Sequence, residues 1–214
     1  MNKLKAMVLT GFSSLALCAV AAAQDWQPPG EFQLASTEFT NGGSLPISAI
    51  YNGQMGGTNV CSNNGAAGGD LSPELHWIHA PRGTRSFVVM TYDETAAVVH
   101  WGMYNISGNR TNLPQNAGAA PATGMLNPYG SMVTNVFDDE SYDGPCPPAG
   151  VPPDAHHYVF TVYALDVELD VYSPANFPPS ALTLYRDLLK AARENHVLGS
   201  ASLLGLYSST PAAN

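Results

Sequence analysis

The sequence predicts one mainly β domain with a single helix near its C-terminal end. The 20 glycines and 17 prolines among 214 residues indicate many turns and disfavour a helical bundle. Several short runs are rich in β-branched and aromatic residues, which is typical of buried strands. With 45% apolar and 12% charged residues, the chain can bury a sizeable core and lacks the composition of a disordered protein.

The first 23 residues have the features of a secretory signal peptide. Lys3 and Lys5 precede the apolar stretch Ala6–Val20, and Ala21–Ala23 supplies small residues for cleavage. The apolar stretch is too short to span a bilayer stably. We therefore expect residues 24–214 to form one mature domain that is periplasmic or secreted and does not span a membrane.

The charge of the chain excludes some partners. Loss of Lys3 and Lys5 with the signal peptide takes the formal net charge from −9 to −11 and leaves six basic residues. Such an acidic protein has no electrostatic footprint for nucleic acid or for an anionic membrane surface. Local hydrogen-bond donors could still hold a single anionic group.

Three cysteines are present. Cys18 lies in the signal segment, and lipoprotein processing there is disfavoured because the preceding Leu17 is not small. Cys61 and Cys146 remain as an even pair in an exported chain, which favours a disulfide over two buried free thiols. The bridge would close a loop of about 85 residues and tie the Gly/Asn-rich region to a second, Pro-rich loop.

The elements follow in order along the chain. Phe32–Phe39 alternates weakly and predicts a first strand, and Asn52–Asp70 reads as a long irregular loop. Asn112–Asp143 is long, polar and turn-rich, as functional or mobile loops are. Three runs predict buried strands, namely Phe87–Tyr92, Trp101–Ile106 and Tyr158–Leu165.

One helix is predicted after a break at Pro178-Pro179. Ser180 is the candidate N-cap, and Gly199 is the expected stop. Apolar residues at helical spacing predict the buried face, which would comprise Leu182, Tyr185, Leu188, Leu189 and Ala192. Basic residues are expected to point outward, namely Arg186, Lys190 and Arg193.

Two short stretches carry the functional signal, Asp93–Trp101 and Gly144–Tyr158. Each places a histidine, His100 or His156, at the edge of a strand-like run. Imidazoles, a phenol and free backbone N–H groups all donate hydrogen bonds, so a pocket built from them suits an anion. Taken alone, each histidine would more commonly be structural. His157 is expected to point away from the pocket, because side chains alternate along a strand.

The motif order resembles the phosphatidylethanolamine-binding protein family, and most of all its bacterial branch described as Raf-kinase-inhibitor-like. The resemblance runs from about Phe39 to Tyr207. The motifs that carry it are Ser72–Trp77, Pro81–Phe87, Tyr92-Asp93, His100-Trp101, Gly144–Pro148, His156–Phe160, His196–Leu198 and Gly205–Tyr207.

The resemblance implies an antiparallel β-sandwich with peripheral helices and a small pocket that accepts phosphate-like head groups. Carried over by motif, the pocket residues are Asp93, His100, Gly144, His156 and Tyr158. The family's Asp-Pro-Asp-Ala-Pro stretch is here Asp-Glu-Thr-Ala-Ala, from position 93. A hydroxyl in place of the second carboxylate, with both prolines lost, is expected to make the pocket less negative and less rigid. His76 and His79 are expected at the surface.

Motifs of common enzymes are absent from the sequence, including Gly-x-Ser-x-Gly, His-Glu-x-x-His, the Walker loop and Gly-x-Gly-x-x-Gly before a helix. A metal cluster of Cys146, His156 and His157 is disfavoured, because adjacent strand residues diverge. A hydrolase using Asp93 and His100 lacks a motif that specifies its serine.

We therefore expect a non-enzymatic binding protein, without cofactor, for a small anionic or phosphorylated ligand. The alternative is an interaction module that inhibits a protease or kinase through the pocket rim and the loop Asn112–Asp143.

Overall fold

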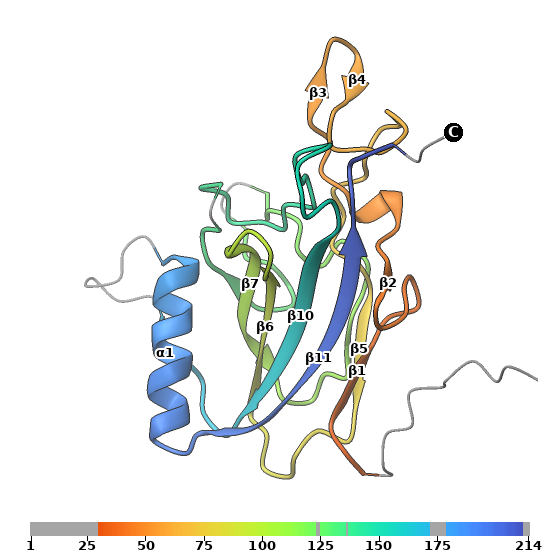
Figure 1. Cartoon of the computed structure of the whole chain (residues 1–214). Helices are drawn as coiled ribbons and strands as arrows, with labels where there is room; N and C mark the ends of the chain where they lie inside the picture. Colours follow the sequence, from red (N-terminus) through yellow and green to blue (C-terminus); the bar gives the residue numbers. More distant parts are fainter. Residues whose placement is uncertain (1–29, 123–124, 136, 172–178, 212–214) are drawn as a thin grey trace, which may run out of the picture.

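The computed structural model describes residues 30–122, 125–135, 137–171 and 179–211. The predicted signal peptide, residues 1–23, lies outside these residues. The described chain forms two packed sheets, a small hairpin and one helix at the side (Figure 1). Their bounds are β1 Gln33–Ala35, β2 Gly43–Ser44, η1 Ile47–Ala49, β3 Gln54–Met55, β4 Thr58–Asn59, β5 Leu75–Ile78, β6 Ser86–Asp93, β7 Val98–Ser107, β8 Asn112–Leu113, β9 Ser131–Met132, β10 His156–Leu165, α1 Ala181–Arg193 and β11 Val197–Tyr207.

The larger sheet has the order β2-β11-β10-β6-β7-β9, and the smaller sheet has the order β1-β5-β8. All pairings are antiparallel except that of β2 with β11. Aromatic side chains fill the space between the sheets: Trp77 lies 4.9 Å from Phe87, and Phe39 lies 5.4 Å from Phe160, between ring centroids. The predicted mainly β class and antiparallel sandwich are therefore confirmed.

The three predicted buried strands correspond to β6, β7 and β10. Their inward residues are almost fully buried, whereas the predicted strand Phe32–Phe39 is reduced to β1. No local pattern indicates β11, whose middle is Gly199–Ser202. Glycine, serine and alanine have low strand propensity, but β11 pairs along its whole length with β10, so tertiary pairing overrides the local preference.

The helix begins as predicted and ends earlier. The Ser180 hydroxyl accepts the N–H of Thr183 at 3.3 Å, and the Thr183 hydroxyl accepts the N–H of Ser180 at 2.7 Å, which together form a capping box. The predicted stop at Gly199 is wrong. The helix ends at Arg193, and Asn195 adopts a φ of 62°, a left-handed conformation that ends helices.

The predicted buried face of α1 is also wrong, apart from Leu188. Leu182 is 66% exposed and Tyr185 is 51% exposed. The buried residues are Ala181, Leu184, Leu188 and Ala191. Two apolar stripes overlap on this helix, and the one that contains Ala181, Leu184 and Ala191 packs inward. The basic residues point outward as predicted.

Two single substitutions test this helix. Ser180→Ala is expected to lower the free energy of unfolding by about 1 kcal/mol, because it removes the N-cap acceptor. Leu182→Ala is the control and should change it by less than about 0.5 kcal/mol, since its side chain is exposed. Urea unfolding measures both, and a cost of about 2 kcal/mol for Leu182→Ala would show that the outer stripe is packed.

Candidate functional site

The site lies at one end of the larger sheet, where β6 ends and β7 and β10 begin (Figure 1). Tyr158 of β10 stands opposite Asp93 of β6, and the inward row of β10 starts with His156 and Tyr158. Antiparallel pairing thus brings together side chains that are far apart in the sequence. His157 points outward and is exposed, as alternation predicts.

Asp93 holds His156 in place. Its Oδ2 lies 2.7 Å from Nδ1 of His156, and its Oδ1 accepts the N–H groups of Thr95 at 2.8 Å and Ala96 at 2.9 Å. The carboxylate is only 2% exposed, so these bonds replace the water it has lost. His156 Nδ1 therefore carries the proton of this hydrogen bond, and Nε2 of the same ring has no proton while the ring is neutral.

The loop that departs from the family pattern is well anchored. The Thr95 hydroxyl accepts the N–H of His157 at 3.0 Å, and Glu94 N–H donates to the carbonyl of His157 at 2.9 Å. These hydrogen bonds to β10 constrain the loop where the family pattern has prolines, and the expected lower rigidity of the pocket stays a prediction.

His100 is buried with one nitrogen satisfied. Its Nδ1 donates to the carbonyl of Asp143 at 2.8 Å, which fixes the tautomer, whereas its buried Nε2 has no partner among the described residues. Burial lowers the pKa of His100, since a desolvated imidazolium is disfavoured. In the ring's neutral form, Nε2 is an acceptor, and it becomes a donor only after protonation.

Tyr158 lies between the two histidines. Its ring centroid is 5.2 Å from that of His100 in an edge-on arrangement and 6.3 Å from that of His156 in a stacked one. Burial and the nearby Asp93 carboxylate raise the pKa of Tyr158, so the phenol stays protonated and can donate.

Gly144 was expected to offer a free backbone N–H to a ligand, but that N–H is already engaged. Its N–H donates to Oδ1 of Asp70 at 2.7 Å and so is not free for a ligand. A Cβ at this position would lie 2.2 Å from the carbonyl oxygen of Ala49, which explains why only glycine fits. The backbone N–H of Gly144 is thus already engaged, and the remaining predicted donors are the Tyr158 hydroxyl and, when the rings are protonated, Nε2 of each histidine.

Asp70 supports the Gly144 loop from behind. Burial, with the nearby Asp143 and Asp139 charges, raises its pKa to about 6, although the N–H of Gly144 opposes the shift. A raised acid pKa favours the folded state while the group is protonated. The stability contribution of Asp70 should therefore be lost as pH rises from about 4 through about 6.

This predicts that Asp70→Asn weakens the pH dependence of the melting temperature between about pH 4 and about pH 7. The amide oxygen can still accept from Gly144, while the buried charge is removed. Glu31→Gln, an exposed acid, serves as the control. A variant with the same pH profile as the unchanged protein would contradict the assignment.

Cys61 and Cys146 form the predicted disulfide, with Cα atoms 4.4 Å apart. The bridge ties the Gly/Asn-rich loop that carries β3 and β4 to the Pro-rich loop beside the site. Because both thiols are consumed, the alternative of a Cys146 metal ligand is not supported. No group of three or more histidine, cysteine or acidic side chains suited to a metal occurs among the described residues.

A cavity of about 300 Å³ opens between these side chains. It is lined by Tyr51, Asp93, Ala96, Val98, His100, Phe137, Gly144, Cys146, Pro147, Pro148, His156 and Tyr158. All five predicted pocket residues are present. Tyr51 and Phe137 were missed, because each lies in a loop without a pattern that would indicate a pocket.

Comparison with known proteins shows the family of this chain. The family model described as phosphatidylethanolamine-binding protein matches residues 35–208. The chain belongs to the phosphatidylethanolamine-binding protein family. The UPF0098 protein YbhB of Escherichia coli (strain K12) is 32% identical over 182 residues, which cover 82% of this chain and 99% of YbhB.

Structural relatives of this family agree as well. The crystal structure of E. coli YbcL, described as a new member of the mammalian PEBP family, matches with a TM-score of 0.64 and 30% identity. The match covers 83% of this chain and 98% of YbcL. A homologue from Chlamydia trachomatis shares the fold with a TM-score of 0.57 and 24% identity, covering 84% of this chain and 98% of that one. Within the described residues, no helix is long and apolar enough to cross a membrane.

Proposed function

We propose that this family member is an exported, non-enzymatic binding protein whose cavity holds a small anion, such as a phosphate head group. The observation that supports this most is the buried Nε2 of His100, which has no partner among the described residues and belongs to a side chain that lines the cavity. Buried polar atoms in proteins nearly always find a partner, so this nitrogen is suited to a ligand atom.

The other walls of the cavity fit this function. Tyr158 adds a hydroxyl donor beside His100, Nε2 of His156 becomes a donor when its ring is protonated, and Val98, Pro147 and Pro148 form an apolar wall. Hydrogen bonds to an anion are stronger in such a low-dielectric site than in water. Export is supported by the signal-like residues 1–23 and by the disulfide, which belongs to oxidising compartments.

Titration calorimetry with phosphoethanolamine, inorganic phosphate and sulfate tests the proposal. We expect saturable heat with each anion and net proton uptake near neutral pH, because His100 must be protonated to donate from Nε2. Proton uptake is read from the change in heat between buffers of different ionisation enthalpy. No saturable heat at millimolar ligand would overturn the proposal.

A second candidate is a protein-interaction module, and exposed apolar residues near the site favour it. Phe137 at the cavity rim is 53% exposed, and Leu126 of the same long loop is 91% exposed. After export the target would be an envelope protease or a host protein rather than a cytoplasmic kinase. Binding of a purified target that is lost in Phe137→Ala and Leu126→Ala but kept in His156→Ala would favour this role over the pocket role.

A further inference from the structure

Strand β11 has an open edge. On one side it pairs along its whole length with β10, but on the other side only Gly205 and Leu206 pair, with β2. The backbone groups of Leu204 also point to the side of β2. Its N–H donates to Oδ1 of Asn41 at 2.9 Å, and its carbonyl accepts the N–H of Gly42 at 2.8 Å. The stretch of β11 before Leu204 has no neighbouring strand there within the described residues.

The direction of the backbone groups follows from the register. Leu204 stands opposite Val159 in a pair whose backbone groups do not bond each other. In an antiparallel ladder such pairs recur every second residue, so Ser202 opposite Thr161 and Ser200 opposite Tyr163 are of the same kind. The N–H and C=O groups of Ser200 and Ser202 therefore point to the open edge, as those of Leu204 do. Neither residue has a main-chain partner on that side among the described residues.

Among the described residues, this edge carries none of the features that discourage strand pairing. Natural proteins protect open edges with lysine, proline or a bulge. The six residues at positions 198–203 are Leu-Gly-Ser-Ala-Ser-Leu, without charge or proline, and the register is regular from Gly199 onward. An unprotected edge of this kind is a template for another strand.

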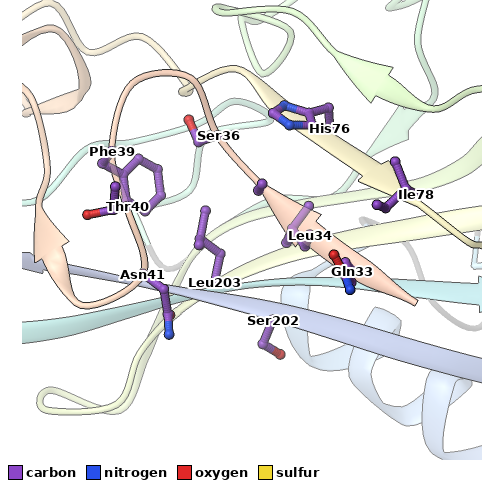
Figure 2. A pocket seen from close by; sticks show the side chains of 11 residues that line it. Gln33, Leu34, Ser36, Phe39, Thr40, Asn41, His76, Ile78, Ser202 and Leu203 are labelled. Carbon is purple, nitrogen blue, oxygen red and sulfur yellow. The ribbon is translucent and has the colours of Figure 1, made fainter. Parts of the chain in front are cut away.

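A groove of about 350 Å³ runs beside this edge, between β1 and β11 (Figure 2). Figure 2 shows Leu34 and Leu203 inside the groove, with Phe39 at one end and Ser202 on the β11 side. Apolar and polar side chains both line it. The groove can therefore take the apolar side chains of an extended chain at alternate positions, while the others face solvent.

We propose that the open edge of β11 binds an extended segment of another polypeptide as an additional strand, in line with β2. The backbone groups of Ser200 and Ser202 supply the hydrogen bonds, and the groove accepts every second side chain. The partner segment lacks proline at the pairing positions and is neutral or basic, because this chain carries a formal charge of −9. The groove and the anion cavity have no lining residue in common.

The first test uses the full mature chain and the peptide acetyl-Lys-Thr-Val-Thr-Val-Thr-Lys-amide, followed by ¹⁵N NMR. We expect saturable shifts at the amides of Ser200 and Ser202 and protection of both from exchange. The same peptide N-methylated at every threonine and valine keeps its charge but cannot pair, so it should cause neither effect. Equal shifts from both peptides, or none from either, would overturn the proposal.

Two variants at one position provide the matched comparison. Ser202→Pro removes the N–H that points outward, and it spares the ladder to β10. It should weaken peptide binding by about five-fold or more. Ser202→Ala keeps the N–H and loses only the hydroxyl that bonds Thr161, so its affinity should be unchanged. Equal affinities for the two variants would count against strand addition.

Circular dichroism shows whether Ser202→Pro folds. If it does not fold, the comparison of the two peptides on the unchanged protein still tests the proposal. A second copy of this chain is the competing occupant. A dimer in sedimentation that dissociates in Ser202→Pro would assign the edge to self-pairing and overturn the proposed partner.

Discussion

Replacing both bridged cysteines, Cys61→Ala with Cys146→Ala, should lower the free energy of unfolding by about 3–5 kcal/mol. The bridge joins residues 85 positions apart, so its loss releases a large loop in the unfolded chain. Cys61 is also almost fully buried, and its replacement leaves a small cavity. Urea unfolding of the oxidised protein and of the double variant measures the difference.

Chemical reduction of the disulfide is the control for this double substitution. Dithiothreitol should destabilise the unchanged protein toward the value of the double variant and leave the variant itself unaffected. Because Cys146 lines the cavity, reduction should also weaken anion binding. A double variant within about 1 kcal/mol of the unchanged protein would show that native contacts alone hold the two loops together.

Sulfate affinity should fall about ten-fold or more in His156→Ala, because a charge-assisted hydrogen bond is worth roughly 1.5–3 kcal/mol. Tyr158→Phe should cost less, since a neutral hydroxyl contributes about 0.5–1.5 kcal/mol. His157→Ala is the matched control: it lies on the same strand, points outward and should bind like the unchanged protein. Equal binding by His156→Ala and His157→Ala would remove this histidine from the site.

The affinity of the cavity for an anion should also depend on pH, through His100. Burial lowers the pKa of His100 in the free protein, and a bound anion favours the protonated ring. Affinity should therefore increase as pH falls below about 7 and level off below the lowered pKa of the free protein. Sulfate is the suitable probe, because its own charge does not change in this range. Affinity that is flat between about pH 5 and about pH 8 would count against His100 as a donor to the anion.

The sequence predicted the strands that carry the candidate site better than it predicted the helix packing. Motif order named five residues that line one cavity; four of them lie near strand ends marked by aromatic and β-branched runs, whereas Gly144 lies in a loop. Periodicity could not choose between two apolar stripes on α1, since Leu182 and Leu184 both repeat at helical spacing. Which stripe is buried depends on the shape of the sheet beneath it.

Other features depend on long-range contacts and leave no local signal. Strand β11 forms because β10 offers a complete pairing edge, although its stretch Gly199–Ser202 has low strand propensity. The bond from Gly144 to Asp70 joins loops 74 positions apart, so a motif could name the glycine but not the acceptor. Tyr51 and Phe137 reach the cavity through loop paths that no periodicity describes.

The cavity draws its walls from segments spread between Tyr51 and Tyr158, more than half of the described chain. A molecule bound there contacts several of these segments at once, so it binds the folded chain and is released when the chain unfolds. A ligand that binds only the folded protein must therefore raise the free energy of unfolding, by about 2.7 kcal/mol at a concentration one hundred times its Kd, and the melting temperature rises with it. Measuring the melting temperature in the presence of each member of a library of phosphorylated and anionic compounds would thus identify ligands by the stability that they add.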